Sequence, residues 1–227
     1  AGRKLGSHVR KGKKLANEFK KRNYIETYIP HLVVALKDIL KLTEKDAPRL
    51  FAEIEEVKRD FRALDKLGKP VVAALEGAAL GGGWELALAA HCRICLDDER
   101  IELGLPEATL GLLPGASGVT KTVRLLGLQA ALPMLMEGKT MRPQEAAKLG
   151  FLQGLAASRE DLLRMAREWI AKNPSPRQPW DEENYRMPGG TPASPQIAQM
   201  LAIAPAMLIE KTRGLYPAPE AIMAAAV

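Results

Sequence analysis

Two acidic residues stand beside rigid turns, where carboxyl groups are suited to proton transfer. Glu85 follows three consecutive glycines in the stretch GAALGGGWELALAA, and Glu107 follows Pro106 among apolar residues. Burial raises the pKa of one member of such a pair, so that one acid donates a proton while the other activates a water. These residues therefore predict an acid and base pair. The same residues also fit a surface acid at position 85, or two acids that cap helices.

The three glycines predict a site for negative charge at the start of a helix. The first N–H groups of a helix have no partner inside it, and the aligned peptide dipoles favour an anion there. Glycine also lets a ligand oxygen come close to the backbone. A phosphate-binding loop would need a lysine after the glycines, and a dinucleotide fingerprint would need glycine at Leu86. A transient oxyanion is the remaining interpretation.

The chain alternates helices with short strands. The first predicted elements are a Thr-capped amphipathic helix over 44–67, a buried strand over 70–75 and a helix over 82–91. Strands over 93–96 and 101–105 follow, and helices then dominate. These later helices are predicted over residues 116–126, 128–137, 142–149, 159–173, 196–212 and 217–226.

Composition and charge narrow the functional classes. With 227 residues and 47% hydrophobic content, the chain can bury a full core. No apolar run approaches the roughly 18 residues of a membrane span, and no secretory signal is recognisable, so we expect a cytoplasmic protein or one of the mitochondrial matrix. Residues 1–22 carry nine Lys or Arg against one acid. This basic arm is typical of a solvated tail, and it would also suit nucleic acid, acidic lipid or a polyphosphate.

Cys92 and Cys95 form a C-x-x-C pair, a spacing found in redox and zinc sites. The stretch HCRICL alternates like a half-buried strand, and no second Cys/His pair is present to complete a tetrahedral site. We therefore expect structural thiols and no metal site.

The stretch GAALGGGWELALAAHCRICLDDERIELGLPEATLGLLPGASGVTKTVRLLG resembles the crotonase, or enoyl-CoA hydratase/isomerase, family. The resemblance implies an α/β fold, a spiral of ββα units with C-terminal helices. It divides the chain into a basic, divergent segment (1–29), a crotonase core (30–173), and a connector with C-terminal helices (174–227). The last part is similar to the connector after the hydratase module of multifunctional fatty-acid oxidation proteins.

The resemblance also implies an activity, the addition of water to 2-enoyl-CoA thioesters in β-oxidation. Gly82 matches the family glycine whose N–H binds the thioester oxygen. Glu85 matches the residue that deprotonates water, and Glu107 matches the residue that protonates the α-carbon. Trp84 stands where a smaller residue is usual, and we expect it to pack in the core. No metal or cofactor is implied, since the CoA thioester is the substrate. The expected assembly is a homo-trimer or hexamer, or a part of a multifunctional β-oxidation protein.

The amino-terminal part departs from the family pattern. Residues 32–36, LVVAL, replace the glycine-containing loop that supplies a second oxyanion donor, which predicts a weakened oxyanion hole and low activity. Either this terminus is divergent, or segments are missing between its residues. The departure keeps a second function open: a catalytically weak crotonase-fold protein that binds RNA or another polyanion through its basic arm.

Overall fold

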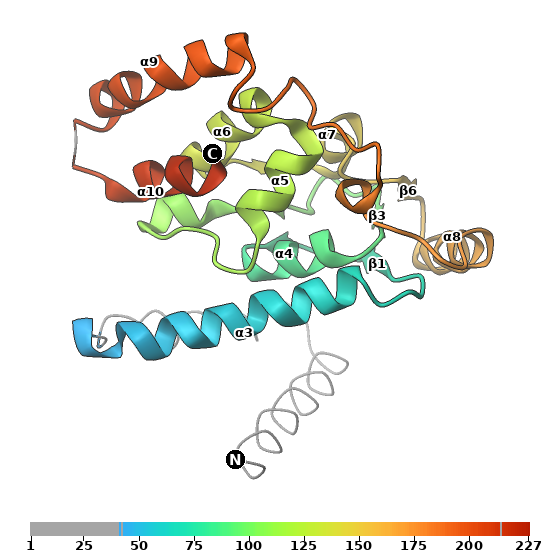
Figure 1. Cartoon of the computed structure of the whole chain (residues 1–227). Helices are drawn as coiled ribbons and strands as arrows, with labels where there is room; N and C mark the ends of the chain where they lie inside the picture. The colour runs from blue at the N-terminus through green and yellow to red at the C-terminus, as the bar shows by residue number, and fades with distance from the viewer. Residues whose placement is uncertain (1–40, 42, 214) are drawn as a thin grey trace. The chain divides into compact units, whose positions relative to one another are not determined.

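The computed structural model describes residues 41, 43–213 and 215–227. The chain divides into two compact units, residues 1–51 and 52–227 (Figure 1). All of the elements that position the predicted site belong to the second unit.

Several predictions concern residues outside the described ones. They are the basic arm (1–22), the divergent segment (1–29) and the altered loop (32–36). These, and the predicted boundary after residue 173, stay predictions.

The first described helix confirms the predicted amphipathic helix over 44–67. It opens with a 3-10 turn, η1 (Glu44–Asp46), and continues as α3 (Ala47–Asp65). Thr43 donates from its N–H (3.0 Å) and from Oγ1 (2.9 Å) to Asp46 Oδ2, which fixes the start of the turn. The chain leaves the helix before Gly68, whose φ of +68° favours glycine.

Three parallel strands form the first sheet. They are β1 (Val72–Leu75), β3 (Cys92–Leu96) and β6 (Gly154–Ala156), in the order β1-β3-β6. The central strand β3 is buried along most of its length, so the prediction that it alternates as a half-buried strand was wrong. A central parallel strand is covered on both faces, which favours a continuous apolar run over alternation.

Arg93 is the polar residue in that central strand, and it is 2% exposed. Its guanidinium donates to Phe151 O (2.6 Å) and to Ala90 O (2.8 Å), which satisfies two carbonyls at the strand end. Burial lowers the pKa of Arg93 to about 10, so the side chain remains charged at neutral pH.

Three shorter strands form the second sheet. They are β2 (Ala79–Leu80), β4 (Leu103–Gly104) and β5 (Thr140–Met141), in the order β2-β4-β5. The β2 and β4 strands are parallel, and β4 and β5 are antiparallel. The sequence pattern missed β2, β5 and β6, because two or three residues are too few to show a period.

The first four strands alternate between the two sheets. The chain runs β1, β2 and then helix α4 (Gly82–Ala89), followed by β3, β4 and the 3-10 helix η2 (Pro106–Leu110). Each pair places its first strand in one sheet and its second in the other. This repeat is the expected α/β spiral of ββα units.

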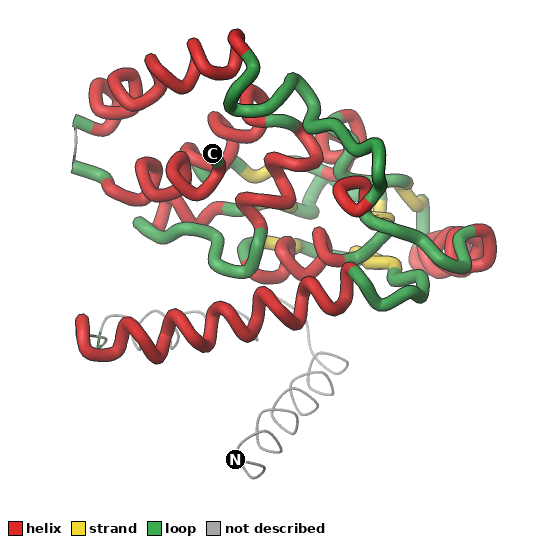
Figure 2. Tube along the Cα trace, in the orientation of Figure 1, coloured by secondary structure: helices red, strands yellow, loops and turns green. Residues whose placement is uncertain are grey.

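Helices pack against both sheets, α8 (Arg159–Lys172) on the first and α4 on the second; Figure 2 colours helices red and strands yellow. The helix α8 packs against β1, β3 and β6, while α5 (Gly118–Leu126) and α6 (Leu128–Glu137) pack against each other. The remaining helices are α7 (Pro143–Lys148), α9 (Pro195–Thr212) and α10 (Pro217–Ala226), and α10 packs on α6 and α5. Among the described helices, none combines the length and apolar character needed to cross a bilayer.

The main hydrophobic core lies around α4, α5 and α6. Trp84 is 1% exposed and meets Phe151 edge to face, with ring centroids 5.6 Å apart. This contact confirms that Trp84 packs in the core. The same contact holds α4 in place, and Glu85 is the residue after Trp84 on that helix.

Candidate active site

The triple-glycine bend connects β2 to α4, at the place where the sequence predicts an oxyanion site. Gly81 has φ +56° and ψ −130°, a conformation that side chains rarely adopt, and its N–H donates to Gly104 O at 2.9 Å. Gly82 is the first residue of α4, so its N–H has no acceptor inside the helix. A Cβ added to Gly82 or Gly83 would meet no described heavy atom within 4 Å. The bend therefore presents backbone N–H groups beside open space.

Glu85 turns its carboxylate into the protein. It is 3% exposed, and its Oε1 accepts hydrogen bonds from Ala116 N and Gly118 N, both at 2.7 Å. The interpretation as a surface acid is therefore wrong. The alternative that the acid caps a helix is correct in part for Glu85. Gly118 is the first residue of α5, and Glu85 accepts a hydrogen bond from its N–H.

The charge state of Glu85 results from opposing effects. Burial raises the pKa of Glu85, and the two backbone N–H donors, followed by the charges of Lys121 and Lys58, act to lower it. The net effect raises the pKa of Glu85 above its ordinary value, because burial outweighs the two donors and the two cations.

Glu107 reaches the same place from the second sheet. Because β2 and β4 are parallel, with Leu80 opposite Gly104, their carboxyl ends meet at one edge. Gly81 follows one strand there, and Glu107 follows the other. A Cβ on Gly81 would lie 2.8 Å from Glu107 Oε1, so the glutamate is in close approach to the bend.

Glu107 has a different environment from Glu85. Its Oε2 is buried and has no hydrogen-bond partner. Burial, and secondarily the charge of Glu85, raise the pKa of Glu107 to about 7. An unpartnered buried oxygen favours the protonated acid. The pKa values of both glutamates are thus raised, that of Glu107 to about 7, so Glu107 carries its proton for an appreciable fraction of the time at neutral pH, and the apparent pKa values belong to the pair.

The loop before α5 supplies residues that sequence reasoning had not assigned to the site. The Ala116 and Gly118 N–H groups hold Glu85, and a Cβ on Gly118 would lie 2.8 Å from Glu85 Cγ. Between them, Ser117 has φ +87°, and its buried Oγ has no partner. The signal was present in the last glycine of PGASG, Gly118, which the close approach of Glu85 explains.

The two cysteines do not form a reactive site in this structure. Cys92 and Cys95 are free and buried in β3. Burial raises the pKa of Cys92 to about 11 and that of Cys95 to about 12, so both remain thiols at neutral pH. Within the described part of the chain, no group of three or more His, Cys, Asp or Glu is arranged to hold a metal ion. These findings support the interpretation of both cysteines as structural.

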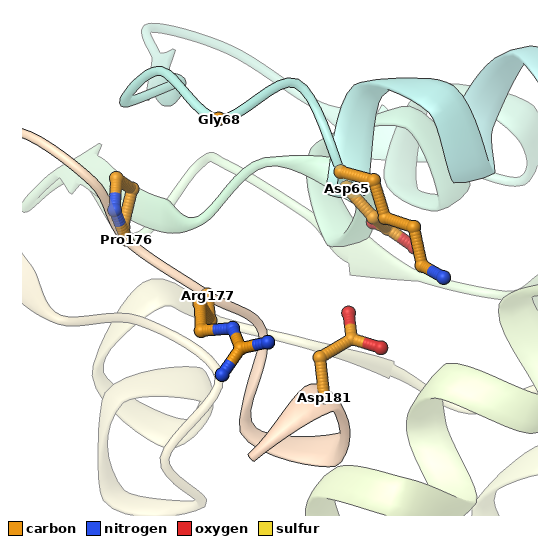
Figure 3. A pocket seen from close by; sticks show the side chains of 6 residues that line it. Asp65, Gly68, Pro176, Arg177 and Asp181 are labelled. Atoms are coloured by element: carbon orange, nitrogen blue, oxygen red, sulfur yellow. The ribbon is translucent and has the colours of Figure 1, made fainter.

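A separate polar cavity of about 420 Å³ lies between the end of α3 and the connector after α8 (Figure 3). Its lining consists of Asp65, Lys66, Gly68, Pro176, Arg177 and Asp181. Neither of the two glutamates nor Gly82 lines it, so this cavity is distinct from the predicted site.

Comparison with known proteins agrees with this architecture. The sequence profile of the family described as "Enoyl-CoA hydratase/isomerase" matches residues 36–178. The fatty acid oxidation complex subunit alpha of Shewanella loihica is 40% identical over 182 residues, which are 80% of this chain and 25% of that protein. The chain thus spans about a quarter of the length of this relative.

Solved structures show the same fold. An enoyl-CoA hydratase from Bacillus anthracis is 32% identical, with a TM-score of 0.52 over 60% of this chain and 51% of that one. An enoyl-CoA hydratase from Thermoplasma volcanium is 26% identical, with a TM-score of 0.53 over 60% and 53% of the two chains. Since the family profile covers well over half of its residues, this chain belongs to the enoyl-CoA hydratase/isomerase, or crotonase, family.

Proposed function

We propose that this chain is an enoyl-CoA hydratase that adds water to 2-enoyl-CoA thioesters. The observation that carries the proposal is that buried Glu85 and half-buried Glu107 both lie at the glycine bend where helix α4 begins. Two backbone N–H groups donate to Glu85 Oε1, which favours its ionised form, and Glu107 has a buried oxygen without a partner. Addition of water across a double bond needs one base and one acid.

In the proposed reaction, the Gly82 N–H binds the thioester oxygen. Glu85 removes a proton from water, and the oxygen bonds to the β-carbon of the enoyl group. The electrons of the double bond move onto the thioester, and the resulting enolate is stabilised at Gly82. Loss of one such donor typically costs about 3–4 kcal/mol in the barrier.

Glu107 completes the addition by giving its proton to the α-carbon. The enolate collapses to the 3-hydroxyacyl-CoA, which leaves Glu85 protonated and Glu107 ionised. Proton exchange with solvent then restores both groups. The sum is one water added, with no change in oxidation state. Such a reaction requires neither a metal nor a redox cofactor.

The substrate class follows from the relatives named as enoyl-CoA hydratases and from the relative named as a fatty acid oxidation subunit. We place the reaction in β-oxidation, in the cytoplasm or the mitochondrial matrix. We also propose that this segment acts either as a trimer or hexamer, or as the hydratase part of a longer protein. Light scattering of the purified chain would report its assembly.

The direct test is hydration of crotonyl-CoA by the purified chain. The enoyl thioester ultraviolet band should decrease, and mass spectrometry should detect a product heavier by one water. Turnover should be unchanged by EDTA. Release of free CoA thiol would instead indicate thioester hydrolysis. A folded protein, verified by circular dichroism, that leaves the band unchanged would overturn the proposal.

A further inference from the structure

A buried ion pair lies one helical turn from the residues that hold Glu85. Lys121 Nζ is 2.9 Å from Asp65 Oδ1, and the two side chains are 5% and 1% exposed. Lys121 lies in the first turn of α5, which begins at Gly118, and its N–H donates to Ser117 O at 2.9 Å. The same turn therefore carries the lysine and the Gly118 N–H that binds Glu85.

Asp65 is a junction of several elements at the end of α3. Its Oδ1 also accepts from Gln178 Nε2 (3.2 Å), and its Oδ2 accepts from Arg62 (3.2 Å). Arg62 in turn pairs with Asp181. We call these five residues, Arg62, Asp65, Lys121, Gln178 and Asp181, the Asp65 cluster.

The two ends of the cluster differ in their contact with solvent. Arg62 is 37% exposed, and Asp181 lines the open cavity of Figure 3, so water screens that end. The Lys121 side chain lies at the buried end of the cluster. Water screens charges less there, so the electrostatic effect of the lysine extends over a longer distance. The charged groups that act on Lys121 are Asp65 and Arg62 on α3 and Arg93 on β3. Lys121 and Lys58 are the charged groups that act on Glu85, and Glu85 is the one that acts on Glu107.

We propose that Lys121 is a positioning residue for the proposed hydration, because it fixes the first turn of α5, whose Gly118 N–H binds Glu85, against Asp65 and its positive charge favours the ionised form of Glu85. This inference rests on the proposed function for its kinetic consequence. The electrostatic part, however, concerns Glu85 itself and can be measured without turnover. Lys121 does not touch the reacting atoms; it acts through Gly118 and Glu85.

The test is a titration of Glu85 by carbon-13 NMR of glutamate-labelled protein, with the signal assigned by Glu85→Gln. Lys121→Met removes the cation and leaves Asp65 charged, so the pKa of Glu85 should rise by about half a unit or more. Asp65→Asn leaves the lysine uncompensated, so the pKa should fall. The double variant removes both charges and should lie close to the wild type. Lys121→Arg keeps the charge and should also stay close.

A role confined to stability predicts another pattern. Every variant would then lose thermal stability without opposite shifts of the Glu85 pKa. Leu162→Ala, in the separate core cluster under α8, is the control for destabilisation alone. If Lys121→Met fails to fold, the other two variants still test the proposal, because the Glu85 pKa should be lower in Asp65→Asn than in the double variant. Equal Glu85 pKa values in the folded variants would overturn the proposal.

Kinetics separates this inference from the proposed function. In an active protein, the acid limb of the pH profile of kcat/KM should move up in Lys121→Met and down in Asp65→Asn. If the wild type does not hydrate crotonyl-CoA but the NMR shifts occur, the proposed function fails and the electrostatic role stands. If the wild type is active and the shifts are absent, the electrostatic role fails and the proposed function stands.

Discussion

Glu85 and Glu107 have the same side chain, and their surroundings assign them different chemistry. Glu85 Oε1 accepts two backbone hydrogen bonds, whereas Glu107 Oε2 has no partner. Each hydrogen bond to a carboxylate favours its ionised form, and burial without a partner favours the acid. The proposed division into base and acid thus rests on the different surroundings of the two carboxyl groups.

Replacing Glu107 by Gln removes the transferable proton and keeps the size of the side chain. We expect kcat for crotonyl-CoA hydration to fall about 100- to 10,000-fold, with a smaller change in KM. Steady-state kinetics on the purified variant measures this. Glu102→Gln is the matched control, since Glu102 is a neighbouring, half-exposed acid that pairs with Arg142. Near wild-type turnover in Glu107→Gln would exclude Glu107 as the acid.

The pKa of Glu107 also makes stability depend on pH. Folding raises this pKa from 4.5 to about 7, so the folded state binds the proton more tightly. The resulting stabilisation is complete below about pH 4.5 and is lost as the pH rises through 7. Relative to Glu107→Gln, the wild type should therefore lose free energy of unfolding between pH 5 and pH 8. Urea unfolding of both proteins at the two pH values checks this, and parallel curves would contradict it.

At the scale of elements, the site is assembled where parallel strands end and helices begin. The pairing of β2 with β4 brings the glycine bend beside η2, and the loop before α5 meets α4. Strands of two residues are sufficient to build the site. The register between β2 and β4, rather than their length, determines which residues come together where the two strands end. Glycine at 118 is required because Glu85 occupies the space of a side chain.

Gly118→Ala tests this contact between elements. The new Cβ would lie 2.8 Å from Glu85 Cγ, 2.9 Å from Glu85 Oε1 and 2.9 Å from Leu105 Cδ1, so Glu85 must move. We expect a stability loss of about 1–3 kcal/mol, as in overpacked cores, and a loss of turnover. Gly115→Ala is the control, because its Cβ would meet only Ile54 at an ordinary 3.8 Å. Similar behaviour of the two variants in unfolding and kinetics would contradict the steric argument.

At the scale of the whole second unit, the Asp65 cluster joins segments that are distant in the sequence. Gln178, in the connector after α8, is 1% exposed and donates to Asp65 as well as to Ala89 O and Ala90 O at 3.2 Å each. The connector is thereby fastened to the ends of α3 and α4. Its 3-10 helix η3 (Pro179–Asp181) adds the ion pair with Arg62.

Gln178→Ala should weaken this junction. The change removes a buried donor from three oxygens, and we expect the free energy of unfolding to fall by about 1–3 kcal/mol. Chemical denaturation followed by circular dichroism measures the loss. Gln129→Ala on α6 is the control, because Gln129 is exposed. An unchanged midpoint in Gln178→Ala would show that the hydrogen bonds contribute little.

Much of the helical framework was predictable from the sequence. The predicted helices over 128–137 and 217–226 match α6 and α10, and the helix over 159–173 matches α8 to within one residue. Caps and apolar spacing are local signals, so they can be read without knowing the partner surface. The two-residue strands and the burial of β3 depend on neighbours in space and were not predictable in this way.

For the site, the sequence by itself was sufficient to predict the residues proposed to carry the chemistry: a glycine bend at the start of a helix, and two acids next to turns. These depend on residue type and local backbone freedom. Only the tertiary structure decided that Glu85 meets the Ala116 and Gly118 donors, that Glu107 Oε2 is buried without a partner, and that Lys121 is paired with Asp65. The physical reason is that protonation depends on burial and on donors from distant parts of the chain, which the folded packing brings together.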